Sequence, residues 1–225
     1  MNQPFILGFD SAGNGASVAV LRDDAIVAMR ADARPHGQAE ILMPMIADAL
    51  ADAGIEAASL GAIGVATGPG SFTGLRIAIA AARGLALATG VPAVGVTRFA
   101  AVAAQFPAQN RSGRALLVAL DTRREDFFLQ LFAGNEAEPF LADGAEAARS
   151  LPAIPLLLAG DAAHRFAPFL RGHDMRVADE PERPIAADVA RLAAAAFRPG
   201  VAASPPRPLY LRAPDTTAPK RQAAR

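Results

Sequence analysis

One short pattern occurs twice in the chain, and this repetition limits the possible folds more than any other feature. Residues 5–9 form an apolar run that ends at Asp10, and residues 115–120 form a second apolar run that ends at Asp121. Six residues after each aspartate another β-prone run begins. A repeated strand–Asp–turn–strand unit indicates an internal duplication, and therefore two related domains.

The order of the periodic segments predicts an α/β fold. Up to residue 106 the hydrophobic spacing alternates between strand and helix periods in the order βββαβαβα, which is typical of a mixed sheet with flanking helices. The segment 107–113 is polar and rich in turn residues. We therefore expect an N-terminal domain at 1–106, a C-terminal domain at 107–213 and a loose tail at 214–225. The proline-rich stretch 204–212 is expected to be extended along the surface.

Composition excludes several classes of function. The chain is 52% hydrophobic, has no net charge and contains no cysteine. A balanced charge argues against binding nucleic acid through bulk electrostatics, and the lack of cysteine excludes disulfides and thiolate chemistry. The start of the chain lacks the basic region of a signal peptide, and the apolar run 77–89, interrupted by Arg83, is predicted too short to span a bilayer. We expect a cytoplasmic protein with no membrane partner.

The segment GPGSFTGLR at 68–76 is the most distinctive local feature. It joins an apolar strand at 62–66 to a helix, and its glycines and proline predict a tight turn with Ser71 or Thr73 as helix N-cap. Free N–H groups at a helix start can bind a phosphate. The alternative is a closely packed turn without a ligand, because the pattern matches neither the Walker loop nor the dinucleotide fingerprint.

The helix predicted at 73–89 is apolar on nearly all sides, with Arg76 and Arg83 as its only charges. A helix that covers one face of a sheet should have a polar outer face. We therefore expect this helix and the one at 37–53 to form a protein interface, unless the second domain covers them. The residues expected at this interface are Ile41, Leu42, Met45, Ser71, Phe72, Thr73, Leu75, Arg76, Ile79, Ala82 and Arg83.

Metal and triad chemistry find little support in the sequence. The three histidines, His36, His164 and His173, include no pair at the i, i+4 spacing of a helical zinc site, and no GxSxG motif is present. We predict no metal site and no catalytic residue, and a metallopeptidase is the least favoured hypothesis.

The duplicated unit resembles the two phosphate hairpins of actin-like and hexokinase-like ATPases, which have ribonuclease H-like domains. That resemblance implies a cleft in which Asp10 and Asp121 face each other and hold Mg²⁺ through water. An ATP-dependent phosphotransferase is thus an alternative function. The other interpretation is that both aspartates only end strands through Asx turns. The candidate cleft residues are Asp10, Ser11, Gly13, Gly15, Asp121, Thr122 and Arg123.

A more specific resemblance covers essentially the whole chain. The segment 68–76, Asp10-Ser11, Asp121-Thr122-Arg123 and the PLYLR stretch at 208–212 occur in the order and at the length seen in the TsaB (YeaZ) family. Members of that family are the dimerisation subunits of the bacterial tRNA threonylcarbamoyladenosine machinery. The resemblance implies duplicated actin-like domains and a paralogous relationship to TsaD, the catalytic subunit.

The resemblance also implies partners. TsaB-like proteins pair with TsaD through the two N-terminal helices, or form a homodimer through the same face. Together with the ATPase TsaE, the complex transfers a threonylcarbamoyl group to the adenosine beside the anticodon of ANN-decoding tRNAs. The chain would then meet tRNA only through the complex. It would require no cofactor itself, while ATP and Mg²⁺ serve the wider complex.

Two departures from related sequences predict a non-catalytic scaffold. TsaD-like chains carry a metal-binding histidine pair after the strand that corresponds to 93–96, whereas this chain has no histidine at 97–101. The first hairpin reads Asp10-Ser11-Ala12, and the second contains the bulky Arg124-Glu125. We therefore expect the nucleotide cleft to be vestigial.

Overall fold

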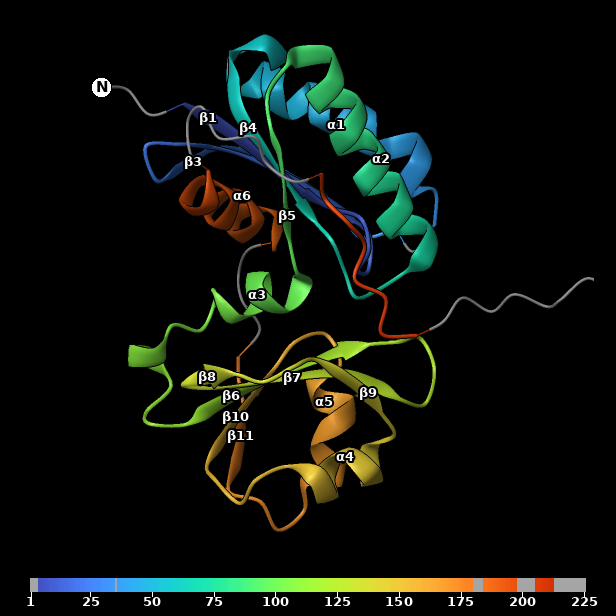
Figure 1. Ribbon diagram of the computed structural model, residues 1–225, viewed down its shortest axis with the longest axis vertical. Coiled ribbons are helices and arrows are strands. Elements are labelled where there is room, and N and C mark those ends of the chain that lie inside the picture. Colours follow the sequence, from blue (N-terminus) through green and yellow to red (C-terminus); the bar gives the residue numbers. More distant parts are fainter. Residues whose placement is uncertain (1–3, 35, 180–183, 198–204, 213–225) are drawn as a thin grey trace, which may run out of the picture.

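The computed structural model describes residues 4–34, 36–179, 184–197 and 205–212. Two mixed β-sheets follow each other along the long axis of the molecule (Figure 1). The first sheet has the strand order β3-β2-β1-β4-β5. Its strands are β1 (Phe5–Asp10), β2 (Ala16–Arg22), β3 (Ala25–Asp32), β4 (Leu60–Ala66) and β5 (Ala93–Val96).

The second sheet repeats the topology of the first. It has the order β11-β10-β6-β7-β8, and β9 pairs with β7. In both sheets the opening strand is antiparallel to the next strand and parallel to the strand that follows the first helix. This match confirms the predicted duplication. The strands are β6 (Ala115–Asp121), β7 (Phe127–Ala133), β8 (Asn135–Glu136), β9 (Phe140–Ala142), β10 (Leu156–Ala159) and β11 (Met175–Val177).

The helices begin and end close to the predicted positions. Ser71 is the N-cap of the longest helix and accepts a hydrogen bond from the Gly74 amide, while Gly90 ends that helix in the left-handed conformation. The α-helices are α1 (Gln38–Asp52), α2 (Phe72–Thr89), α3 (Arg98–Ala103), α4 (Gly144–Ser150), α5 (Ala163–Phe166) and α6 (Ala186–Ala196), and the 3₁₀ turns are η1 (Ala57–Ser59), η2 (Ala108–Asn110) and η3 (Ala167–Leu170).

Helices α1 and α2 lie side by side on one face of the first sheet (Figure 1). Their apolar residues at helical spacing, such as Leu42, Ile46 and Leu75, are buried in one cluster with Phe9 and Val18 of the strands. Burial of one such side chain contributes about 1.5–3 kcal/mol to the free energy of unfolding. This cluster holds the two helices on the sheet.

The last helix of each repeat packs on the sheet of the other repeat. Helix α6 covers the second face of the first sheet, where Val189 and Ala193 join Ala62 and Ala66 in a buried cluster. It approaches closely because Gly64 of β4 has no side chain, and a Cβ there would collide with Ala193.

Helix α3 makes the reciprocal contact with the second sheet. Its Phe99 and Val102 are buried with Leu116, Val118 and Leu120 of β6. We call the first sheet with α1, α2 and α6 the first lobe, and the second sheet with α3, α4 and α5 the second lobe. The predicted C-terminal domain, 107–213, includes α6, although α6 packs on the first sheet. The division at residue 106 stays a prediction, but helix packing does not follow it.

Within the described part of the chain, α2 is the one helix long and apolar enough to cross a bilayer by length and composition alone. It has 18 residues and a mean hydropathy of 1.3. The sequence predicts that the apolar run 77–89 is too short to span a bilayer. That prediction is wrong for the helix as a whole, because the helix begins at Phe72 and is long enough. In the folded chain its inner face is part of the core of the first lobe.

Two glycines of α2 provide a matched test of this packing. A Cβ on Gly74 would collide with the carbonyl oxygen of Ser11, whereas a Cβ on Gly84 would meet no atom within 4 Å. We expect Gly74→Ala to lower the free energy of unfolding by about 1–3 kcal/mol, and Gly84→Ala to raise it by about 0.5–1 kcal/mol. Chemical denaturation of the two variants measures both effects, and equal midpoints would contradict the close contact at Gly74.

Candidate functional site

The first predicted phosphate hairpin follows β1 and is closed by its own side chains. Asp10 Oδ1 accepts a hydrogen bond from the Ala12 amide at 2.8 Å, which forms an Asx turn. The Ser11 hydroxyl donates to the carbonyl of Gly74 at 2.7 Å. Ser11 therefore faces the start of α2, and its hydroxyl is used to hold that helix.

Arg98 of α3 forms an ion pair with the Asp10 carboxylate on the lobe boundary. Its Nε lies 3.4 Å from Asp10 Oδ2, and its other nitrogens donate to the Pro69 carbonyl and to Asp161 Oδ2, each at 3.1 Å. Arg98 and Asp10 are each 5% exposed. Burial lowers the pKa of Arg98, but attraction to Asp161 and Asp10 outweighs burial and raises it above its ordinary value.

The second predicted hairpin has a similar arrangement with a different arginine. Asp121 Oδ1 accepts from the Arg123 amide at 2.9 Å and from the Arg165 guanidinium at 2.8 Å. The Asp121 amide donates to Asp161 Oδ1 at 2.7 Å. Asp161 thus connects the two hairpins, because its other oxygen binds Arg98.

The structure therefore brings the two predicted aspartates into one network, but not as facing ligands of an open cleft. Each carboxylate is paired with an arginine, at Arg98 and Arg165. A carboxylate that holds Mg²⁺ offers its oxygens to the ion or to its water shell. At Asp10 the buried guanidinium stands in that place, and a side chain at Gly13 would collide with it. The close contact with Arg98 therefore accounts for a glycine at position 13, and no bound phosphate is needed to explain it.

The 68–76 segment is a packed turn in which several amides already have partners. The Ser71 amide donates to the Ala12 carbonyl at 2.8 Å, and the Gly74 amide donates to Ser71 Oγ at 3.3 Å. A Cβ on Gly70 would collide with the Ala12 carbonyl. These contacts support the closely packed turn over the phosphate cradle.

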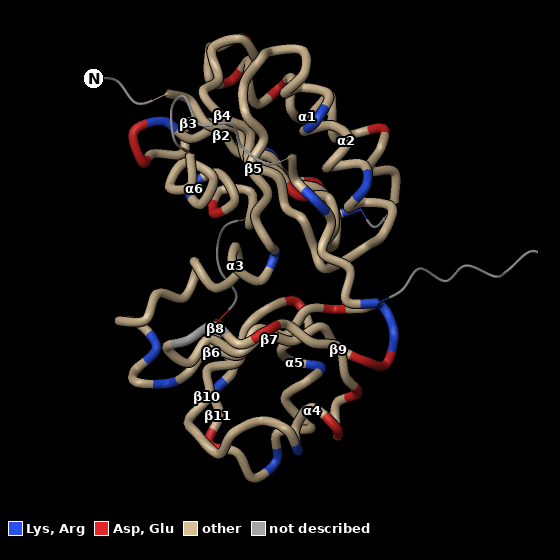
Figure 2. The backbone as a smooth tube through the Cα atoms, viewed as in Figure 1, with Lys and Arg blue, Asp and Glu red and all other residues tan. Residues whose placement is uncertain are grey.

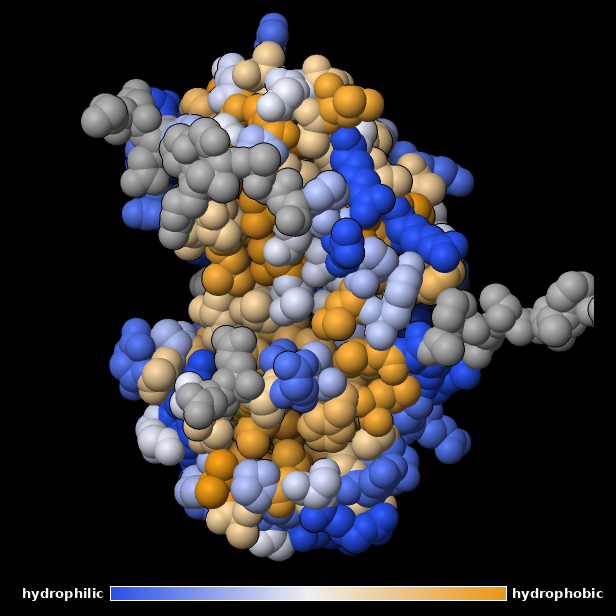
Figure 3. All heavy atoms as spheres, in the orientation of Figure 1, coloured by the Kyte–Doolittle hydropathy of each residue, from blue (hydrophilic) through white to orange (hydrophobic). Residues whose placement is uncertain are grey.

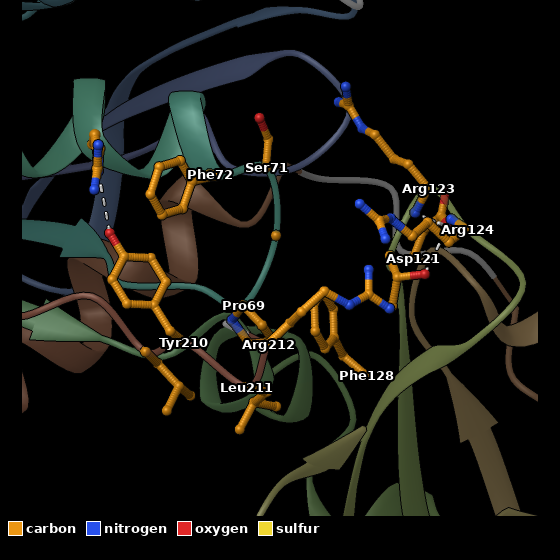
Figure 4. Close-up of a pocket in the computed structure, with 14 residues that line it drawn as sticks. Pro69, Ser71, Phe72, Asp121, Arg123, Arg124, Phe128, Tyr210, Leu211 and Arg212 are labelled. Atoms are coloured by element: carbon orange, nitrogen blue, oxygen red, sulfur yellow. Dashed lines mark hydrogen bonds between the residues drawn. The ribbon is translucent and has the colours of Figure 1, made fainter. Parts of the chain in front are cut away.

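A pocket of about 530 Å³ opens between this turn, the second hairpin and the C-terminal segment (Figure 4). It is lined by residues 69–72, 76, 121–124, 128 and 209–212. Arg76, Arg123, Arg124 and Arg212 contribute positive charge and Asp121 contributes negative charge. The excess of guanidinium groups favours an anionic over a cationic group at this pocket.

The C-terminal segment 205–212, which we call the strap, crosses from the first lobe to the second. The Leu209 amide donates to the Thr67 carbonyl at 2.8 Å, and Arg83 donates to the Pro206 carbonyl at 2.7 Å. Tyr210 stacks against Phe72 with ring centroids 5.2 Å apart (Figure 4).

The strap ends on the second lobe, where Arg212 pairs with Asp126. Burial raises the pKa of Asp126, but hydrogen bonds from Arg212 and Thr122 outweigh burial and hold the pKa below its ordinary value.

A second cavity, of about 400 Å³, lies where the lobes meet around α3. Its polar lining includes Asn14, Arg98, Asp161 and His164.

In the described part of the chain no three His, Asp, Glu or Cys side chains gather as metal ligands would. Acidic and basic positions are interspersed over both lobes (Figure 2).

The prediction of an interface position is wrong for four residues, because they do not reach the surface. Leu42, Leu75, Ile79 and Ala82 are buried in the core of the first lobe. The sequence could not separate the two sides of α2, because both are apolar. Ile41, Met45, Ser71 and Phe72 are half-buried, and Thr73, Arg76 and Arg83 are exposed.

The structure instead defines an outer stripe on α2, made of residues at steps of three or four. Leu87 in this stripe is 88% exposed. Apolar and strongly polar residues alternate over this side of the molecule (Figure 3). The outer stripe consists of Thr73, Arg76, Ala80, Arg83, Gly84 and Leu87, all exposed.

Sequence reasoning did not find Asp161, Arg165 or the contacts of Arg98. Position 98 stood out only because a histidine was missing there, and nothing in the pattern linked it to residue 161. The Gly160-Asp161 turn after β10 is a signal that could have been used, since Gly160 has a positive φ of 104° and a Cβ there would collide with the Ala119 carbonyl.

Comparison with known proteins gives three consistent similarities. A family model described as TsaD, tRNA N6-adenosine threonylcarbamoyltransferase, matches residues 32–138. An uncharacterized protein of Mycobacterium tuberculosis is 32% identical over 215 residues, which cover 93% of this chain and 92% of that protein. The tRNA threonylcarbamoyladenosine biosynthesis protein TsaB of Escherichia coli is 32% identical over 131 residues, which cover 58% of this chain and 56% of TsaB.

A solved structure agrees with the sequence matches. YeaZ from Pseudomonas aeruginosa superimposes with a TM-score of 0.75 at 26% identity, and the match covers 93% of this chain and 100% of YeaZ. The similarity therefore extends over both lobes, in agreement with the duplicated actin-like fold.

The strap can be tested with the fluorescence of the chain itself. Tyr210 is the only tyrosine and the chain has no tryptophan. Arg212→Met removes the pairing with Asp126, so we expect a lower fluorescence anisotropy of Tyr210 than in the unmodified chain. Arg207→Met, at an exposed position of the same strap, is the control. Equal anisotropy in both variants would show that Arg212 does not hold the strap.

Proposed function

Because the chain belongs to the TsaB (YeaZ) family, we propose that it is a non-catalytic scaffold subunit of the tRNA threonylcarbamoyladenosine machinery. In this role it pairs with the catalytic subunit TsaD. The pairing supports threonylcarbamoyl transfer to the adenosine beside the anticodon of ANN-decoding tRNAs.

The observation that carries this proposal is the outer stripe of α2, which stays exposed although the strap contacts its Arg76 and Arg83. The helix buries one side in its own lobe, and the stripe opposite remains exposed in the described structure. Ala80 and Gly84 are small, so the backbone of a partner helix can approach closely between them, while Leu87 offers an apolar side chain to bury. Met43 of the neighbouring α1 is another exposed apolar side chain, at 46%.

We infer the absence of a catalytic role from the two side chains at positions 97 and 98. Thr97 caps α3 by accepting a hydrogen bond from the Ala100 amide, and Arg98 pairs with two carboxylates. These residues stand where TsaD-like chains are expected to carry metal-binding histidines. Neither side chain is a metal ligand of the kind that histidine provides.

The proposal includes the rest of the predicted assembly. The chain would form a homodimer through the same stripe when TsaD is missing, and TsaE would join the TsaD-bound form in the cytoplasm. tRNA would be contacted only through the complex. The chain itself would need no cofactor, and ATP and Mg²⁺ would be used by the wider complex.

The alternative is an ATP-dependent phosphotransferase of the actin-like fold. It requires Asp10 or Asp121 to hold Mg²⁺ beside a nucleotide. The pairing of Asp10 with buried Arg98 disfavours it, because the guanidinium already neutralises the carboxylate.

A charged residue in the outer stripe tests the pairing. Ala80→Glu would place a carboxylate in the proposed helix contact, and an unpaired buried charge costs several kcal/mol. We expect pairing with TsaD to weaken by about 100-fold or more, measured by co-elution and titration. Reconstituted tRNA modification should fall in parallel.

The control for this variant is Ala145→Glu, on an exposed position of α4 in the second lobe. It adds the same charge away from the stripe, and pairing should stay as in the unmodified chain. Undiminished co-elution of the Ala80→Glu variant would contradict the proposed interface. Full tRNA modification in a mixture without this chain would contradict the scaffold role.

Calorimetry with Mg–ATP distinguishes the scaffold from the phosphotransferase. Since Asp10 is neutralised by Arg98, we expect the isolated chain to bind Mg–ATP with a Kd weaker than about 1 mM, or not at all. A tighter, magnesium-dependent Kd would instead support the phosphotransferase.

A further inference from the structure

The guanidinium of Arg98 contacts three parts of the chain that are far apart in sequence. It forms an ion pair with Asp10 at the end of β1, and it donates hydrogen bonds to the Pro69 carbonyl in the turn before α2 and to Asp161 after β10. The first two belong to the first lobe and the third belongs to the second lobe. A single planar group therefore lies on the boundary of the lobes with acceptors on both sides.

Because Arg98 is buried, the loss of any of these contacts would be costly in free energy. Arg98 is 5% exposed, and a buried guanidinium requires an opposite charge close by. Two of its nitrogens donate hydrogen bonds, and Nε has only the ion-pair contact with Asp10. The Asp10 carboxylate is equally buried, so it depends on Arg98 in the same way. Opening the lobes would separate Arg98 from Asp161, or from Asp10 and the Pro69 carbonyl.

The backbone around Arg98 reinforces the connection to α2. Its amide donates to the Gly68 carbonyl at 2.7 Å, one residue before the Pro69 carbonyl that its side chain contacts. Gly13 is packed against the guanidinium, with no room for a Cβ between them. The first hairpin, the turn before α2 and the start of α3 thus share one tightly packed site.

Other side chains also cross between the lobes. Gln105, just after α3, donates to Asp188 of α6 at 2.9 Å, and Asp188 is 1% exposed. Arg123, an exposed residue, donates to the Gly13 carbonyl at 3.2 Å, and Arg212 of the strap pairs with Asp126. Arg98 differs from them because one buried guanidinium contacts two carboxylates and a carbonyl.

We propose that Arg98 is the positioning residue that locks the two lobes at one angle, without any bound nucleotide, and that fixes the start of α2 relative to the second lobe. The lock consists of Arg98, Asp10, Asp161 and the Pro69 carbonyl. It goes beyond the scaffold role, because it concerns the conformation of the isolated chain.

The absence of cysteine allows a direct measurement of the lobe angle. Ala58→Cys and Ala145→Cys place one spin label on an exposed position of each lobe. Pulsed electron paramagnetic resonance then gives the distribution of distances between the labels. It is recorded on the full chain and on the chain with Arg98→Met or Asp161→Asn added.

We expect a single narrow distribution for the labelled chain and a broadened or shifted one for both variants. The Asp161→Asn variant retains the Arg98–Asp10 pair and removes only the charge on the second lobe, so it decides the question if Arg98→Met does not fold. The control is Arg114→Met, which breaks an ion pair with Asp174 inside the second lobe. This control should leave the distribution unchanged.

A second measurement separates the lock from a general loss of stability. If Arg98 and Asp161 act together, the double variant should unfold at the same denaturant midpoint as Arg98→Met alone. An unchanged distance distribution in folded Arg98→Met or Asp161→Asn would overturn the proposal, as would fully additive midpoints. Both measurements use the chain without TsaD, so their outcome is independent of the proposed pairing.

Discussion

The fold depends on covering four sheet faces, because both sheets are apolar on both sides. In each repeat the helices between the strands cover one face, as α1 and α2 do in the first lobe and α4 and α5 in the second. The remaining faces are covered by exchange, with α6 on the first sheet and α3 on the second. Neither repeat can bury its own sheet alone, so the two lobes depend on each other for their cores.

The exchange also explains the site between the lobes. Since α3 must leave the first sheet to reach the second, its first residue, Arg98, lies on the boundary. There it meets Asp10 and Asp161, and the resulting network occupies the region where two phosphate hairpins were expected to face an open cleft. The same aspartates that suggest nucleotide chemistry in the sequence are used in this chain to hold arginines.

Among the described residues, one side of helix α2 is buried in the first lobe, and the strap covers part of its flank. Arg83 and Phe72 hold the strap through Pro206 and Tyr210, while Leu87 further along the helix stays exposed. An apolar helix in this position has buried surface still to gain from a partner. The packed turn at 68–76 determines where α2 begins. This segment, which the chain shares with the TsaB (YeaZ) family, therefore positions the helix that carries the proposed interface.

The sequence by itself determined the duplication, the order of the elements and most of their ends. Those features depend on local chemistry: the strand and helix periods, the caps at Ser71 and Thr97, and the left-handed Gly90. Only the tertiary structure decided which side of α2 faces the sheet, which sheets α3 and α6 cover, and what Arg98 binds. The reason is that these contacts join residues far apart in the chain, such as Arg98 and Asp161, 63 positions apart, and no local pattern records such a pairing.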